Sequence, residues 1–407
     1  MNSHVMPHMR SITVQAPAKV NLQLAVGGRR NDGYHELANV FLAVSCSDEV
    51  ILTPAEELRV TVSGAQADRV PADDSNLAAQ AVKLLAKRSG VDPGVHVHID
   101  KRIPVQGGMA GGSADAAGAL VGCNALWNLG LSQTDLVSLA AELGSDVPFS
   151  VLGGAALGIG RGERLTSLTV GGNSHWVFAM AEFGLSTPEV FAAQERFRRD
   201  SGRPWAAHLM PLPRASEQLI DVLAGGDAFA LAQMLSNDLE PVVTSMRPEL
   251  ARTLETGRNA GALAGMLCGT GATVAFLVSD HRHAQIVAKT LLESGTCASV
   301  QMAHGPVPGP QPKEIIVTGE KPMTSHVQSR EEVFAVLRRI WEEVLETPVD
   351  DPEENFIELG GDSLLALVVA DRAQEAGLSM PPTGVLRRPT LRELTDAVLD
   401  PHQFEHW

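Results

Sequence analysis

The sequence of 407 residues predicts an α+β fold followed by a small all-α bundle. Strand-like and helical runs are segregated along most of the chain, instead of alternating as in a doubly wound sheet. A glycine-rich loop joins one strand to one helix, without the spacing of a dinucleotide-binding fingerprint. The C-terminal fifth is strongly acidic and shows only helical periodicity. These three observations set the fold class.

The strands come first. Apolar and polar residues alternate from Ile12 to Val26, which predicts one buried and one open face, with Lys19, Asn21 and Gln23 on the open face. Further strands are predicted at Val50–Thr53, Leu58–Val62, Val95–Ile99, Gly154–Gly158, His175–Met180, Ala272–Val278, Ala298–Ala303 and Lys313–Val317.

Apolar residues at helical spacing predict the helices between these strands. Ser132 and Gly144 have the residue types of an N-cap and a C′ position around one of them. The predicted helices are Asn76–Lys87, Ser113–Leu129, Ser132–Leu143, Thr187–Arg199, Glu217–Leu223, Ala228–Leu235, Glu249–Asn259 and His281–Ser294. Helical periodicity returns at Val333–Leu345, Ser363–Ala376 and Leu391–Leu399, which predicts a small bundle.

Composition excludes several classes of protein. The chain is 44% hydrophobic and 20% charged, as in ordinary globular proteins. Its four widely spaced cysteines form no metal or redox pair, and its net charge of −16 argues against a nucleic-acid surface. No apolar run is long enough for a membrane span, and the N-terminus lacks the apolar core of a signal peptide. We expect a cytoplasmic protein that binds neither nucleic acid nor membrane.

The stretch Pro104–Ser113 predicts an anion site. Four glycines surround two small apolar residues, directly before a run of helix formers. Glycine lets the backbone approach a ligand closely, and a helix that begins there adds free N–H groups and the positive end of its dipole. This combination favours phosphate. The loop contains no lysine, so it is not a P-loop, and the balancing positive charge has to come from elsewhere.

Four motifs in this order resemble the GHMP superfamily of small-molecule kinases over about Ser11 to Val317. They are PAKVNL from Pro17, PVQGGMAGGSADAAGAL from Pro104, GSDVPF from Gly144 and GTGATVAF from Gly269. Two further segments resemble motifs of the subgroup that phosphorylates 4-diphosphocytidyl-2-C-methyl-D-erythritol. They are DGYHEL from Asp32 and LSTPEVF from Leu185. The resemblance implies a two-domain GHMP kinase fold, with an ATP-binding domain at residues 10–165 and a second domain at 166–317.

The resemblance also implies the catalytic roles. Asp146 would take the proton from the substrate hydroxyl, and Lys19 would hold Asp146 ionised and stabilise the transferring phosphoryl group. Without the resemblance, Asp146 reads as a turn aspartate and Lys19 as a solvated surface lysine. Mg²⁺ is expected together with ATP, held largely by nucleotide oxygens and water, so no residue is assigned as a metal ligand.

Binding residues follow from the same motifs. The residues expected to bind ATP are Pro104, Val105, Gln106, Gly107, Gly108, Met109, Ala110, Gly111, Gly112, Ser113 and Ala114. Those expected to bind the alcohol substrate are Asn21, Tyr34, His35, Thr187, Phe191, Gly269, Thr270 and Gly271, with Tyr34 and Phe191 covering the cytosine ring from two sides. Asn76 and Asn124 fit an adenine pocket less specifically, since both residues could equally be helix caps or core amides.

The acidic C-terminal region carries a second motif. From Val327 to Asp400, acidic residues outnumber basic ones 16 to 7. LGGDSL from Leu359 resembles the attachment site of phosphopantetheine carrier domains of the peptidyl or aryl type, which implies 4′-phosphopantetheine on Ser363. We expect a linker at residues 318–328 and a four-helix carrier domain at 329–402. Its partners would be a phosphopantetheinyl transferase and synthetase-type enzymes that dock on the acidic surface.

The fusion leaves two functions open. In the first, the chain phosphorylates the 2-hydroxyl of the cytidylated methylerythritol in non-mevalonate isoprenoid precursor synthesis and carries an appended module. In the second, it is a carrier or scaffold of a secondary-metabolite assembly whose kinase domain acts on another alcohol, either free or tethered to Ser363. The motifs around Tyr34 and Phe191 favour the first function.

Overall fold

The computed structural model consists of two compact units, Met1–Gly319 and Glu320–Trp407. It describes residues 9–64, 66–206, 210–317, 330–345, 347–349, 351–361, 363–376, 378, 380–381 and 384–399. The expected linker at 318–328 lies outside the described residues. The α+β class of the first unit and the helical second unit confirm the predicted fold.

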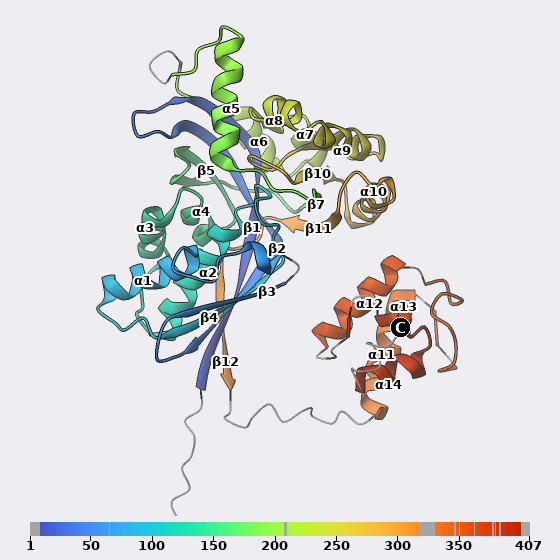
Figure 1. Ribbon diagram of the computed structural model, residues 1–407. Coiled ribbons are helices and arrows are strands. Elements are labelled where there is room, and N and C mark those ends of the chain that lie inside the picture. The colour runs from blue at the N-terminus through green and yellow to red at the C-terminus, as the bar shows by residue number, and fades with distance from the viewer. Residues whose placement is uncertain are drawn as a thin grey trace, which may run out of the picture. The chain divides into compact units, whose positions relative to one another are not determined.

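A large sheet forms the frame of the first unit. Its central pair is antiparallel and long, β1 (Met9–Arg29) against β2 (His35–Pro54) (Figure 1). In the described residues the sheet has the order β12-β1-β2-β4-β3, with β5 and then β6 continuing from the other part of β2, and β8 beside β1. The added strands are β3 (Arg59–Gly64), β4 (Val95–Lys101), β5 (Ala155–Gly160), β6 (Arg164–Ser167), β8 (Ser236–Asn237) and β12 (Gln311–Val317).

Four helices gather on one side of this sheet (Figure 1). They are α1 (Leu77–Ser89), α2 (Gly111–Leu126), α3 (Gln133–Leu143) and α4 (Val147–Leu152). Helix α2 lies closest to the strands because glycines face them. A Cβ added at Gly118 would be 2.8 Å from Val50 Cγ2, and one at Gly122 would be 2.2 Å from Leu52 Cδ1. Only a helix with a glycine face can pack at this distance.

The predicted caps are present in part. Ser132 accepts from the N–H of Asp135, whose carboxylate accepts from the Ser132 N–H, which is a capping box at the start of α3. Gly144 directly follows this helix in extended backbone, with φ 175°, so the C-cap there does not need a glycine. Asn76 caps α1 by accepting from the N–H of Ala78 at 2.8 Å.

A second sheet has the order β11-β7-β10-β9 in the described residues. Its strands are β7 (Ser174–Met180), β9 (Ala264–Leu267), β10 (Val274–Val278) and β11 (Ser299–Gly305). Helices α8 (Glu240–Met246), α9 (Pro248–Asn259) and α10 (His281–Ser294) lie beside it (Figure 1). The remaining helices of the unit are η1 (Ala67–Arg69), α5 (Thr187–Asp200), α6 (Glu217–Gly225) and α7 (Ala228–Ala232).

The second unit has four helices in its described part. They are α11 (Arg330–Leu345), α12 (Ser363–Glu375), α13 (Gly384–Arg387) and α14 (Leu391–Leu399). Apolar positions at helical spacing turn inward, and the fully buried rings of Trp341 and Phe356 pack edge to face at 4.9 Å. Hydrophobic burial in a core of its own is what allows this unit to be compact by itself.

Two sequence expectations were wrong. The open face predicted for β1 is covered, since Lys19 and Asn21 are only 5% and 1% exposed. The loop and turn that form the site lie over this face and remove it from water. The first half of β2 was also missed, because Ala38–Val44 is buried on both faces and its sequence therefore lacks the alternation of a half-exposed strand.

Candidate active site

A cavity of about 1020 Å³ in the described part of the chain gathers most of the predicted site residues. Its walls come from β1, β2, the loop before α2, the start of α4, helix α5 and the turn between β9 and β10. The predicted residues that line it are Lys19, Asn21, Tyr34, His35, Pro104, Gln106, Gly107, Gly108, Ala110, Gly111, Gly112, Ser113, Asp146, Thr187, Phe191, Gly269 and Thr270. Of the residues assigned to catalysis, ATP binding or binding of the alcohol, those that do not line it are Val105, Met109, Ala114 and Gly271.

The glycine loop has the backbone of an anion cradle. Gln106, Gly108 and Ala110 all have positive φ angles, of 55°, 80° and 61°. Residues that alternate between left- and right-handed backbone turn successive N–H groups toward one point. Helix α2 begins at Gly111 with no side-chain cap, so its first N–H groups are left for a ligand.

The loop packs directly against the second glycine motif. A Cβ at Gly108 would lie 1.9 Å from the carbonyl oxygen of Cys268, and the N–H of Thr273 donates to the carbonyl of Gly107 at 3.2 Å. Glycine is required at Gly108 by both its φ angle and this contact. Two motifs that are far apart in sequence therefore form one wall of the cavity.

Lys19 provides the positive charge that the loop lacks. Its Nζ donates to the Gly108 carbonyl at 2.7 Å and to Asn21 Oδ1 at 2.8 Å, which holds the ammonium beside the glycine loop. The amide of Asn21 donates in turn to Asn39 Oδ1 at 2.8 Å. Asn39 was missed, although a polar residue within the apolar run of β2 is a signal that could have found it.

Asp146 occupies the N-cap position of α4, yet its side chain makes no capping hydrogen bond. The interpretation as a turn aspartate that satisfies local N–H groups is therefore not what the structure shows. Among the ion pairs of the described residues, none joins Asp146 to Lys19, but both side chains line the same cavity. The arrangement supplies one carboxylate and one ammonium to a space bounded by a phosphate cradle.

Aromatic rings lie at another part of the cavity. His35 stacks on Phe191 with ring centroids 4.8 Å apart, while Tyr34 is 52% exposed beneath the guanidinium of Arg161. Burial lowers the pKa of His35, against the opposing effect of Glu195, whose Oε1 lies 3.4 Å from Nε2. A neutral imidazole can both donate and accept, which suits recognition of a nucleobase edge.

Helix α5 adds charged residues that sequence reasoning missed. Glu195, Arg196 and Arg199 line the cavity on the same helix as Phe191, and Arg29 joins them from β1. Phe191, Glu195 and Arg199 are spaced four residues apart, so they share one helix face. This spacing was visible in the sequence. Thr187, at the start of the helix, lies with its Oγ1 3.2 Å from Thr270 Oγ1.

The two looser candidates for an adenine pocket have structural contacts. Asn76 caps α1 and also donates to the Pro71 carbonyl at 2.6 Å. Asn124 bonds to the carbonyl and the N–H of Leu131, at 3.0 and 3.1 Å. Neither residue lines the cavity, whereas Leu77, next to Asn76, does.

In the second unit, Ser363 is the first residue of helix α12. The preceding Gly360 has φ +94°, and a Cβ at Gly361 would lie 2.4 Å from Phe356 Cε1, so both glycines are needed for the turn into the helix. Asp362 lies outside the described residues. A hydroxyl-bearing residue thus stands at a helix N-terminus after a tight turn.

Comparison with known proteins agrees with this division. Residues 76–154 match the model of the GHMP kinases N terminal domain, residues 218–296 the GHMP kinases C terminal domain, and residues 335–398 the phosphopantetheine attachment site. The cavity and the serine at the start of α12 therefore belong to separate families that one chain combines.

Relatives and solved structures cover the first unit. A 4-diphosphocytidyl-2-C-methyl-D-erythritol kinase of Streptomyces avermitilis is 56% identical over 74% of this chain and 98% of its own length. Those of Streptomyces coelicolor and Thermobifida fusca are 55% and 52% identical over 74% of this chain and 98% and 97% of their own lengths. A crystal structure of 4-(cytidine 5'-diphospho)-2C-methyl-D-erythritol kinase, 30% identical, covers 72% of this chain and 98% of its own, with a TM-score of 0.58.

A homoserine kinase from Cytophaga hutchinsonii shares the fold at 18% identity and a TM-score of 0.57, over 77% of this chain and 100% of its own. The glycine cradle, the flanking lysine and aspartate, and the extended similarity agree with one another. The chain belongs to the 4-diphosphocytidyl-2-C-methyl-D-erythritol kinase family of ATP-dependent GHMP kinases, and it carries a C-terminal phosphopantetheine carrier domain.

Proposed function

We propose that the chain transfers the γ-phosphoryl group of ATP to the 2-hydroxyl of 4-diphosphocytidyl-2-C-methyl-D-erythritol, a step of non-mevalonate isoprenoid precursor synthesis. The proposal rests mainly on one cavity. It is lined by the glycine loop, by the charged side chains of Lys19 and Asp146, and by the rings around His35. The names of the relatives that match nearly their whole length support the same substrate.

The chemistry assigns one role to each group. Asp146 accepts the proton of the 2-hydroxyl while the oxygen of that hydroxyl forms a bond to the γ-phosphorus. The bond between the γ-phosphorus and the β,γ-bridging oxygen breaks, and ADP is released. Lys19 stabilises the negative charge on the transferring phosphoryl oxygens from its fixed place beside Gly108. The N–H groups of the loop and of the start of α2 bind the remaining phosphate oxygens.

The residues present fit ATP with magnesium. No group of three or more His, Cys, Asp or Glu side chains in the described part of the chain is placed to hold a metal by itself. Beside the glycine loop that lines the cavity, nucleotide oxygens and water would therefore supply most of the coordination of Mg²⁺, without a dedicated set of protein ligands. The ion would neutralise charge on the phosphates.

Substrate recognition rests on the aromatic part of the cavity. Tyr34 offers an exposed ring for stacking on cytosine, and the neutral His35 offers both a donor and an acceptor to its edge. Phe191 lies against His35 and limits the space on that side. The predicted binding roles of Asn21, Thr187, Gly269 and Thr270 are consistent with their places in the lining of the same cavity.

The carrier domain has a proposed function of its own. We assign 4′-phosphopantetheine to Ser363, attached by a phosphopantetheinyl transferase, because the serine opens α12 within the region that matches carrier domains. A helix N-terminus favours the added phosphodiester. The same match supports the second candidate function, phosphorylation of an alcohol tethered to this arm, with synthetase-type enzymes as partners.

The experiment offers the purified chain ATP, Mg²⁺ and one of two untethered alcohols, the cytidylated methylerythritol or 2-C-methylerythritol 4-phosphate. We expect phosphorylation of the cytidylated alcohol alone, with the new phosphate ester on the 2-hydroxyl in ³¹P NMR. Equal turnover of the shorter alcohol would contradict recognition of the cytidine. Absence of turnover with both free alcohols, together with phosphorylation of a carrier-bound alcohol, would establish the second function.

A further inference from the structure

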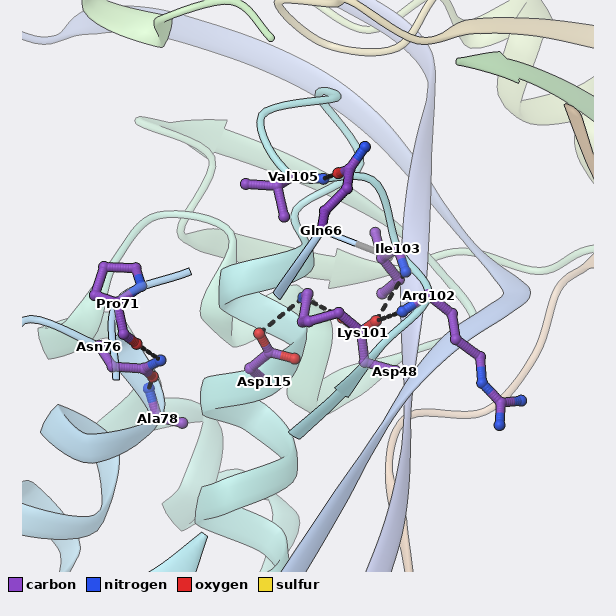
Figure 2. Close-up of polar contacts among 10 residues, drawn as sticks. All are labelled: Asp48, Gln66, Pro71, Asn76, Ala78, Lys101, Arg102, Ile103, Val105 and Asp115. Carbon is purple, nitrogen blue, oxygen red and sulfur yellow. Dashed lines mark hydrogen bonds and ion pairs between the residues drawn. The ribbon is translucent and has the colours of Figure 1, made fainter. Parts of the chain in front are cut away.

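Three charged side chains are buried together beneath the glycine loop, outside the cavity. Lys101 Nζ donates to Asp115 Oδ2 at 2.9 Å and also to Asp48 Oδ2 (Figure 2). None of the three side chains is more than 3% exposed. Replacing a buried ion pair with apolar residues often leaves stability unchanged, so the burial alone explains little. The effect of this group lies in the backbone segments that it holds together.

Each member comes from a different element around the loop. Asp48 lies in β2, Lys101 ends β4, and Asp115 lies near the start of α2 (Figure 2). Asp48 Oδ1 accepts from the N–H groups of Arg102 and Ile103, at 2.6 and 2.8 Å. Asp48 therefore holds the residues that enter the glycine loop, Asp115 belongs to the helix by which the chain leaves it, and Lys101 joins the two.

The loop needs this support because its backbone is unfavourable by itself. Gln106 and Ala110 have φ angles of 55° and 61°, where residues with a Cβ are disfavoured by about 1–2 kcal/mol each. The start of α2 has no side-chain cap, and a Cβ at Gly111 would lie 3.1 Å from Lys101 Nζ. The first turn of the helix thus lies against the Lys101 ammonium.

The two carboxyl groups have different surroundings. Three N–H groups donate to Asp48, whereas Asp115 receives one, and its Oδ1 is buried without a partner. Burial raises the pKa of Asp115 to about 8, more than the nearby Lys101 lowers it. Asp115 is therefore the less favourably placed carboxyl group of the two, and its one hydrogen bond from Lys101 is one that an asparagine Oδ1 can also accept.

We propose that Asp48, Lys101 and Asp115 form a positioning triad that fixes both ends of the glycine loop in the conformation that binds the ATP phosphates. This inference rests on the proposed phosphoryl transfer. Lys19 is also held by Asn21 within β1, and Asp146 lies at the start of α4. Loosening the triad therefore weakens ATP binding and leaves the chemical step of bound ATP nearly intact. The triad acts through the loop and touches neither substrate in the described cavity.

The test compares Asp115→Ala, Asp115→Leu and Asp115→Asn in the full chain. ATP affinity is measured by calorimetry, and KM and kcat are measured for both substrates. In the first two variants Lys101 still pairs with Asp48, so no charge is left unpaired. We expect ATP affinity to fall about tenfold in both, with kcat and the KM for the alcohol within about twofold of wild type, and Asp115→Asn to restore the affinity.

Leu291→Ala is the matched control, since Leu291 is fully buried beside the second sheet and does not line the cavity. It should cost about 2–5 kcal/mol of stability and leave ATP affinity unchanged. The proposal is wrong if the folded Asp115→Ala and Asp115→Leu variants bind ATP like wild type. It is also wrong if Leu291→Ala lowers ATP affinity as much as these two variants do. Because binding of ATP alone is the readout, this result is independent of which alcohol the enzyme phosphorylates.

Discussion

The kinase unit and the carrier unit place their chemistry in opposite ways. The kinase cavity is assembled from β1, β2, a loop, α4, α5 and a distant turn, and its polar groups are held by buried contacts such as Lys19 with Asn21. The carrier site is a single serine at the start of α12, in a bundle whose ion pairs, such as Arg330 with Asp396, are exposed. Exposed pairs contribute little to stability.

This difference has a consequence for mutation. Many single changes should impair an assembled site, because each wall depends on its neighbours, whereas the carrier site should depend on one residue and a folded helix. Changes in one unit should also leave the chemistry of the other intact. Single substitutions in either unit test this independence.

Asp146→Asn should have the largest effect. The amide keeps the size of the side chain but cannot accept the proton, so turnover should fall by about 10²–10⁴-fold or more. ATP affinity should stay within about twofold, because the loop and Lys19 are unchanged. Single-turnover phosphorylation and calorimetric ATP binding measure the two quantities. If the variant turns over at the wild-type rate, Asp146 is not the base.

Gly108→Ala should break the wall between the two glycine motifs. The added Cβ would meet the Cys268 carbonyl at 1.9 Å, at a φ angle of +80°. We expect ATP affinity to fall by at least about tenfold, with a lower melting temperature. Gly225→Ala is the control, since a Cβ there meets nothing within 4 Å. Normal ATP binding by Gly108→Ala would show that this contact is not needed.

The fold of the chain was largely predictable, because strands and helices with one exposed face leave a period in the sequence. That the glycine loop, Lys19 and Asp146 lie at one cavity was predictable through the resemblance of their motifs, whereas the residues alone indicate a turn aspartate and a surface lysine. The positioning triad was not, since Asp48 and Lys101 meet only through the pairing of β2 with β4. The first half of β2 was not predicted, because burial on both faces removes the alternation that identifies a strand.

The pH dependence of stability tests Asp115 without changing a residue of the cavity. Asp115 has a folded pKa of about 8, above the ordinary 3.8, so the folded chain binds a proton there that the unfolded chain releases. Its contribution to stability therefore falls as pH rises from about 4 to 8, by at most about 1.4 kcal/mol per pH unit. Asp115→Asn should remove this slope.

Chemical unfolding of the wild type and of Asp115→Asn at pH 5, 6, 7 and 8 measures this pH dependence of stability. As pH rises, the free energy of unfolding of the wild type should fall relative to that of the asparagine variant. A constant difference between pH 5 and 8 would show that Asp115 is ionised throughout this range.

Ser363→Ala should have the smallest effect on the kinase unit. Intact-protein mass spectrometry should show that a phosphopantetheinyl transferase with coenzyme A modifies the wild type and Asp146→Asn but not Ser363→Ala. Thermal unfolding of the kinase unit should be the same in wild type and Ser363→Ala within about 1 °C, because the changed residue belongs to the other compact unit. Modification of the alanine variant would move the attachment site elsewhere.

The functional independence of the two units is tested most directly by the steady-state kinetics of Ser363→Ala with ATP and untethered 4-diphosphocytidyl-2-C-methyl-D-erythritol. We predict a kcat/KM within about twofold of wild type, since none of the cavity residues belongs to the carrier domain. A loss of about tenfold or more in the alanine variant, reversed in wild type only after phosphopantetheine is attached, would contradict this account and make the carrier part of the kinase reaction.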